Sequence, residues 1–117
     1  MAWQKSPPEL VERFGRVLDR FPDLEQRRMF GYPAAFIGGN LVTSLHESDW
    51  VVRLPEHAQP EALGSGARVF EPMGGRTMRN FVAFPATVTE DPDRIAGWVE
   101  QAMAHARTLP AKPRRKR

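Results

Sequence analysis

A stripe of apolar side chains near the N-terminus recurs at intervals of three and four residues. This spacing predicts an amphipathic helix over 7–20, whose buried side would carry Leu10, Phe14, Val17, Leu18 and Phe21. Ser6, Pro7 and Glu9 predict how the helix begins. The serine is expected to cap it, the proline suits the first helical position, and the glutamate completes a capping box.

A second apolar stripe follows near the C-terminus and predicts a helix over 91–107. Asp91 is the expected N-cap, and Pro92 suits the first turn because proline has no N–H to bond there. The stripe consists of Ile95, Trp98, Val99, Ala102, Met103 and Ala106. Two helices with one apolar side each need a common surface to cover.

The middle of the chain predicts an antiparallel sheet that provides this surface. Short apolar segments between turn-forming residues indicate strands at 24–30, 34–37, 41–45, 50–54, 68–70 and 80–84. A short helix is expected at 59–63. Gly38-Gly39 suits a two-residue hairpin turn that pairs Phe36 with Leu41. Together with the next hairpin, this register assigns one face to the core, with Phe36, Leu41, Leu45, Trp50, Val52 and Leu54. The predicted fold class is therefore α+β, an antiparallel sheet covered by an N-terminal and a C-terminal helix.

The same register places six residues on the opposite face of the sheet: Ala35, Ile37, Val42, Ser44, Val51 and Arg53. Four of the six are apolar, which is more than a sheet face left to water usually carries. We therefore predict that this face contacts a protein partner or a second copy of the chain. Arg53 would add an orienting, charge-assisted hydrogen bond at its edge.

Length and composition indicate one domain. The chain has 117 residues, of which 41% are hydrophobic and 26% charged, as in ordinary globular proteins. We expect a single domain over 1–109 and a disordered basic tail over 110–117. The chain has no cysteine, which excludes disulfides, thiolate metal sites and a cysteine nucleophile. No apolar run is long enough to span a membrane and the N-terminus lacks a signal-peptide core, so we expect a cytoplasmic protein that does not contact membranes.

The positive net charge of the chain comes from its C-terminal end. Residues 107–117 carry six of the 17 basic residues and none of the 14 acidic ones, so 1–106 has a net charge of −3. The run at the very end could contact nucleic acid without sequence preference, through Lys112, Arg114, Arg115, Lys116 and Arg117. A nucleic-acid-associated factor is therefore one alternative function.

Candidate chemistry is sparse. His46 stands beside Glu47 and Asp49, but a metal site needs three well-placed ligands and these three are better explained as turn residues. Three arginines are candidate anion contacts: Arg53, Arg76 and Arg79. A second alternative is thus an enzyme or small-anion binder around His46, Arg53 and Arg79. We assign no catalytic, metal-binding or cofactor-binding residue and predict no cofactor and no enzymatic activity.

Several short motifs resemble one known family. They are Met29-Phe30-Gly31, the Gly39-Asn40 turn, Val52-Arg53-Leu54 and the run 75–79 before a strand that ends at Pro85. Over about 7–107 the chain resembles the TfoX/Sxy N-terminal domain family, although Tyr32-Pro33 stands where a second glycine is often found. The resemblance implies an antiparallel sheet covered by helices, similar to secretion chaperones. Only a short tail follows the last helix, so it also implies a stand-alone N-terminal domain without the C-terminal domain of the full-length competence regulators.

These observations together favour a non-enzymatic binding or regulatory module. The resemblance implies the type of domain, and the apolar second sheet face indicates protein–protein contact. The sequence itself specifies neither the partner nor the biological process.

Overall fold

A computed structural model describes residues 5–70 and 80–111 of the chain. The elements follow one another as α1 (Pro8–Leu18), β1 (Glu25–Met29), β2 (Tyr32–Ile37), β3 (Asn40–His46), β4 (Asp49–Arg53), the 3₁₀ helix η1 (Glu56–Ala58), α2 (Gln59–Gly64), β5 (Arg68–Val69), β6 (Phe81–Phe84), α3 (Ala86–Thr89) and α4 (Pro92–Arg107). Both long helices and every predicted strand are present, with ends that differ from the prediction by one or two residues.

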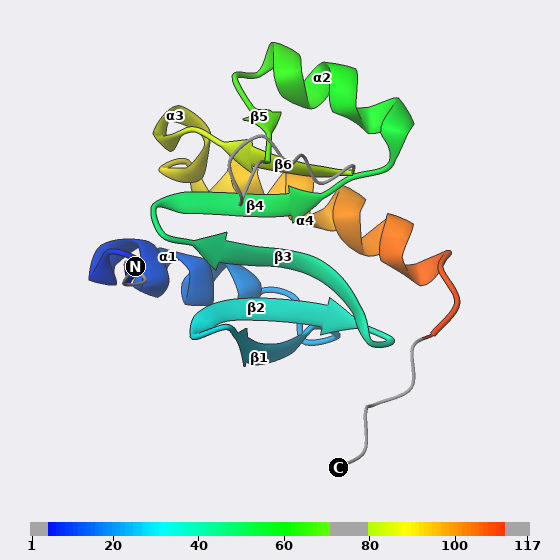
Figure 1. The fold of residues 1–117 in the computed structure, drawn as a ribbon, viewed down its shortest axis with the longest axis horizontal. Coiled ribbons are helices and arrows are strands. Elements are labelled where there is room, and N and C mark those ends of the chain that lie inside the picture. Colours follow the sequence, from blue (N-terminus) through cyan, green and yellow to red (C-terminus); the bar gives the residue numbers. More distant parts are fainter. Residues whose placement is uncertain (1–4, 71–79, 112–117) are drawn as a thin grey trace.

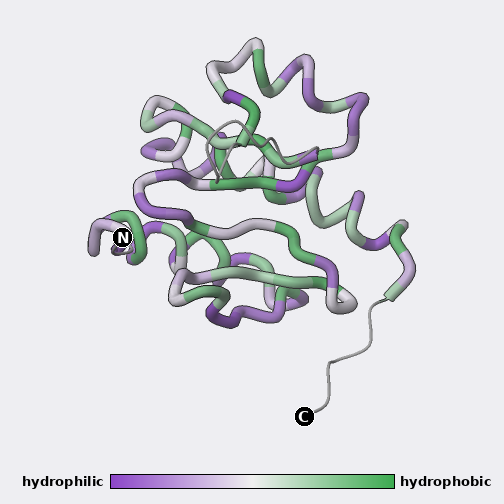
Figure 2. Tube along the Cα trace, viewed as in Figure 1, coloured by the Kyte–Doolittle hydropathy of each residue, from purple (hydrophilic) through white to green (hydrophobic). Residues whose placement is uncertain are grey.

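The strands form one antiparallel sheet in the order β1-β2-β3-β4-β6-β5 (Figure 1). The first four strands are a meander, as predicted, and β6 then pairs with β4 so that Arg53 lies opposite Phe81. The short β5 is the outer strand at that side. At the other edge lies β1, whose residues from Glu25 to Arg28 are exposed and hydrophilic (Figure 2). The predicted α+β class with an antiparallel sheet is confirmed.

Helices α1 and α4 cover the same face of this sheet and enclose the main core (Figure 1). Trp50 is at its centre with no exposed surface, and its ring lies 5.0 Å from that of Phe14 in α1. On the α4 side, the rings of Phe84 and Trp98 are 5.1 Å apart. The predicted core positions Leu45, Trp50, Val52 and Leu54 are all buried in this cluster.

A β-bulge changes the register between β2 and β3. Ala35 pairs with Thr43 but Phe36 pairs with Leu41, so Val42 is an extra residue on β3 that has no partner on β2. An extra residue reverses the alternation of side chains, and residues on its two sides exchange faces. Phe36 and Leu41, predicted to be in the core, are therefore only half-buried and lie outside the main core cluster.

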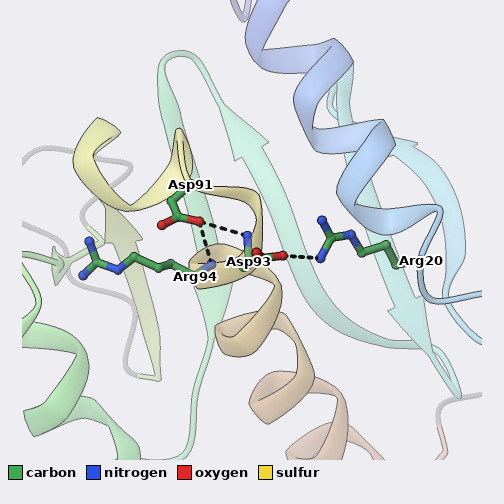
Figure 3. A network of polar contacts seen from close by, with 4 residues as sticks. All are labelled: Arg20, Asp91, Asp93 and Arg94. Atoms are coloured by element: carbon green, nitrogen blue, oxygen red, sulfur yellow. Dashed lines mark hydrogen bonds and ion pairs between the residues drawn. The ribbon is translucent and has the colours of Figure 1, made fainter.

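The two long helices begin differently. In α4, the Asp91 carboxylate accepts hydrogen bonds from the backbone N–H groups of Asp93 (3.1 Å) and Arg94 (3.3 Å), so the predicted N-cap is confirmed (Figure 3). Asp93 in turn accepts a bond from Arg20 at 3.1 Å, which joins the start of α4 to the end of α1. In α1, the N-cap is Pro7 and no side chain caps the helix, so the predicted capping role of Ser6 was wrong.

The chain beyond α4 packs against the β2–β3 hairpin. The side-chain amide of Asn40 donates a hydrogen bond to the carbonyl of Pro110 at 3.0 Å. A Cβ atom added to Gly38 would lie 3.7 Å from Cβ of Ala111. Pro110 and Ala111 thus pack against the folded domain, and the rest of the predicted basic tail, 112–117, lies outside the described part.

Within residues 5–70 and 80–111, no helix combines the length and the apolar composition that crossing a membrane requires.

Candidate protein-contact site

The second sheet face differs from the predicted contact surface. Because of the bulge, Ala35 and Val42 are buried in the main core, and Ile37 packs against it. These three residues therefore belong to the face that α1 and α4 cover. The prediction failed here because it assumed unbroken alternation along β2 and β3.

The remaining members of the predicted surface, Ser44, Val51 and Arg53, do lie on the second face, but the first two are buried. Ser44 is 5% exposed and Val51 is 1% exposed. Val51 belongs to a smaller apolar cluster whose other members are Phe70, Phe81 and Ala83. Val51 is therefore part of a buried cluster and not of an open contact surface.

Arg53 is the one charged member of this set. Its guanidinium carbon lies 5.7 Å from the centre of the Phe81 ring. Its Nε is buried without a hydrogen-bond partner in the part of the chain described here. Arg76 and Arg79, the two other candidate anion contacts, lie outside the described residues, as do Lys112, Arg114, Arg115, Lys116 and Arg117. The anion and nucleic-acid hypotheses stay predictions.

His46 lies apart from Arg53, the other described member of the enzymatic alternative. Its ring lies 5.3 Å from that of Tyr32 and 5.3 Å from that of Phe70, so it packs as an aromatic residue. Asp49 binds Arg68 at 2.6 Å. His46 pairs with Asp49 at one end of β4, and Arg53 is at the other end. His46 and Arg53 are therefore roughly 13 Å apart along the strand direction. No group of three or more histidine and acidic side chains that could hold a metal occurs among residues 5–70 and 80–111.

The most exposed large apolar side chain of the described chain is Phe30, in the turn between β1 and β2. It is 79% exposed. Both turn residues have positive φ angles, 56° for Phe30 and 85° for Gly31. A phenylalanine rarely adopts this conformation, whereas glycine adopts it readily. The guanidinium of Arg28 donates a hydrogen bond to the carbonyl of Gly31 at 2.8 Å and so holds the turn closed.

A cleft lies between this turn and the start of α1. Its volume is about 400 Å³, and its described lining consists of Lys5, Ser6, Val11, Arg28, Phe30, Gly31, Tyr32 and Pro33. We refer to it as the α1–turn cleft. The hydroxyl of Ser6 is buried there without a hydrogen-bond partner within the described ranges. Sequence reasoning missed this cleft, because it treated Ser6 as a helix cap and the turn only as a hairpin signal.

These features describe a small α+β domain, in which two helices cover one antiparallel sheet and an aromatic turn lies at its edge. The family model for the TfoX N-terminal domain matches residues 16–106, which is most of the chain. The chain therefore belongs to the TfoX N-terminal domain family, as the Met29-Phe30-Gly31 turn and the other motifs had suggested. A search among curated proteins gave no match.

Proposed function

We propose that this domain is a non-enzymatic binding module that contacts a protein partner through the β1–β2 turn. The observation that carries the proposal is the Phe30 side chain, 79% exposed at the tip of a closed turn. Burying a phenylalanine in a contact is worth about 1.5–3 kcal/mol. Exposed aromatic residues of this kind are typical anchors at the centre of protein interfaces.

The backbone of the turn supports the same reading. The Arg28–Gly31 hydrogen bond and the tight β1–β2 pairing, in which Met29 lies opposite Tyr32, limit the motion of the backbone at Phe30. A backbone that is already ordered loses little conformational entropy when it binds. The positive φ angle of Phe30 is a cost to the fold, and backbone strain of this kind clusters at functional sites.

The edge strand β1 makes the turn a better contact point than the sheet edge. Glu25, Gln26, Arg27 and Arg28 are exposed along β1. Charged side chains on an edge strand oppose pairing with a further strand. We therefore expect side-chain contact at the turn and not extension of the sheet by a partner strand or by a second copy.

The arrangement of the candidate catalytic residues supports binding over catalysis. His46 packs between two aromatic rings, and Arg53 lies at the opposite end of the β3–β4 hairpin. Neither is placed to act with the other on one substrate atom, which general acid–base chemistry requires.

Comparative capture from native cells tests the proposal. Phe30→Ser removes the anchor at an exposed position, and Leu63→Ser is the matched control because Leu63 is also exposed, at 43%, on α2. A discrete protein should be retained by the parent and by the control and lost with Phe30→Ser. Both variants should unfold at the same denaturant concentration as the parent. Equal retention by all three would contradict a contact at the turn. Sedimentation of the purified chain separates a second copy from a different protein, because self-association through Phe30 would appear without added partner.

A further inference from the structure

The charges around the α1–turn cleft have one sign. Lys5 and Arg28 are its ionisable cations, and no acidic residue is among its described lining residues. Arg28 uses one donor on the carbonyl of Gly31. A guanidinium has five N–H donors, so this bond orients the group while leaving others for a ligand. The geometry of a guanidinium suits the two oxygens of a carboxylate.

Ser6 adds a hydroxyl that the fold does not use. It does not cap α1, where Pro7 is the N-cap residue. Its Oγ is buried with no hydrogen-bond partner in the described chain, which is costly for a hydroxyl. A serine side chain changes rotamer by rotation about a single bond, so this hydroxyl can turn toward an acceptor in the cleft. A ligand oxygen would supply the acceptor that the protein lacks.

The other walls of the cleft are apolar. Val11, Pro33 and the rings of Phe30 and Tyr32 line it. A free phosphate or sulfate would leave these surfaces uncovered, whereas an apolar group beside the anion would fill them. The cleft therefore combines two cations and a free hydroxyl with an apolar wall, in a volume of about 400 Å³, large enough for an amino-acid side chain.

We infer that the α1–turn cleft binds the C-terminus of a protein partner, where a carboxylate lies next to an apolar side chain. This inference names the chemistry that the proposed contact at Phe30 recognises, and it rests on that proposal for the protein origin of the carboxylate. Arg28 and Lys5 bind the carboxylate, Ser6 donates to it, and Phe30 packs on the apolar neighbour.

Small probes test the cleft without the cellular partner. The ¹⁵N-labelled full chain is titrated with N-acetylphenylalanine, which carries a carboxylate beside a phenyl ring, while backbone amide shifts are recorded. We expect saturable shifts in the millimolar range centred on Ser6, Arg28 and Gly31. N-acetylphenylalaninamide is the neutral control and should bind at least about tenfold more weakly, because it cannot form the charge-assisted bonds.

Variants assign the binding to named side chains. Lys5→Gln and Arg28→Gln should each weaken binding of N-acetylphenylalanine several-fold. Arg28→Lys keeps the charge but loses the planar pair of donors, so it should fall between parent and Arg28→Gln. Arg13→Gln is the matched control, because Arg13 is on α1 but lines a different cleft. Amide shifts of β2 in the ligand-free variants report whether the turn is still closed.

Three results would overturn the inference. Equal affinity for the amide would make the cleft a merely apolar groove. Competition by inorganic phosphate as effective as by the probe would make it a general anion site. Absence of any saturable shift in the turn would mean that the cleft binds no such group. Each of these leaves the capture experiment with Phe30→Ser unaffected, so failure here is distinct from failure of the proposed protein contact.

Discussion

Trp50 donates a hydrogen bond from its indole N–H to the hydroxyl of Thr43 at 2.9 Å, in the interior of the main core. The Thr43 hydroxyl donates onward to the carbonyl of Val51 at 2.6 Å. The largest fully buried side chain of the described chain thus has its single polar atom satisfied by a neighbouring strand. This pair fixes which face of β3 meets the helices, because Thr43 must lie on the same side as Trp50.

Thr43→Val should reveal the strength of this relationship. The valine has a similar shape but leaves the indole N–H of Trp50 buried without a partner, which costs about 1–3 kcal/mol. We expect the free energy of unfolding in urea to fall by that amount. Thr87→Val is the control, because Thr87 is exposed on α3, and it should stay within about 0.5 kcal/mol of the parent. Equal stability of both variants would mean that the bond contributes nothing measurable.

The two aspartates at the start of α4 should differ in importance. Asp91 caps two backbone N–H groups, and its replacement by alanine should cost about 0.5–2 kcal/mol. Asp93 makes an exposed ion pair with Arg20 (Figure 3). Asp93→Ala should therefore lower the free energy of unfolding by less than about 1 kcal/mol, and the loss should be seen mostly at low salt. Thermal unfolding of both variants at two salt concentrations measures this. A larger loss for Asp93→Ala would contradict the assignment of the cap.

His105 should make the domain less stable in mild acid. Burial lowers the pKa of His105, and the positive charges of Arg53 and then His57 lower it further. An unfolded histidine titrates near pH 6.5, so the unfolded chain binds the proton first as pH falls. The contribution of this residue to stability is therefore present above about pH 6.5 and is lost as pH falls through the lower, folded pKa. The free energy of unfolding, measured in urea, should fall more steeply with decreasing pH for the parent than for His105→Gln. Parallel curves would contradict the lowered pKa of His105.

Any affinity for nucleic acid should reside in the last six residues. The chain should be truncated after Ala111 and not earlier, because the carbonyl of Pro110 bonds to Asn40. We expect the parent to bind random-sequence duplex weakly, with a steep salt dependence of about 0.9 in log–log slope per phosphate contact, and the truncated chain not to bind. Fluorescence anisotropy at several salt concentrations measures both. Retained, sequence-selective binding by the truncated chain would show that the folded part reads DNA.

Local patterns were enough to predict most of the fold. The apolar stripe of α4 and its Asp91-Pro92 start depend only on neighbouring residues, and both were found as predicted. The hairpin at Glu47-Ser48 pairs Leu45 with Trp50, and both lie on the predicted core face because the turn itself sets the register. The four-residue helix α3 was missed, since it is too short for a periodic signal.

The bulge at Val42 explains most of what failed. Gly38-Gly39 predicts the pairing of Phe36 with Leu41 correctly, and the next hairpin correctly predicts the pairing of Thr43 with Val52. Neither pairing shows whether side chains alternate without interruption along β3 from Leu41 to Thr43, and the bulge at Val42 interrupts that alternation. The small side chain of Ala35 takes the fully buried position. Phe36 lies on the second face, where the guanidinium carbon of Arg27 is 4.2 Å from the centre of the Phe36 ring.

The candidate site was harder to predict than the fold. The exposure of Phe30 cannot be read from the sequence, because phenylalanine is among the residues most often buried. The motif Met29-Phe30-Gly31 identified the family but gave no function. The α1–turn cleft joins Lys5 and Ser6 to Arg28 across more than twenty residues of sequence, and only tertiary packing brings them together.

Photo-crosslinking from position 30 is the sharpest test of a protein contact at the β1–β2 turn. A photoreactive phenylalanine analogue replaces Phe30 in the full chain inside native cells, and the same analogue at Leu63 is the control. We expect one discrete protein adduct from position 30. The analogue at position 63 should not form that adduct. If the partner also occupies the α1–turn cleft, the yield of the position-30 adduct should fall when the same chain carries Arg28→Gln. Adducts that are absent from position 30, or identical from both positions, would contradict a protein contact at the β1–β2 turn.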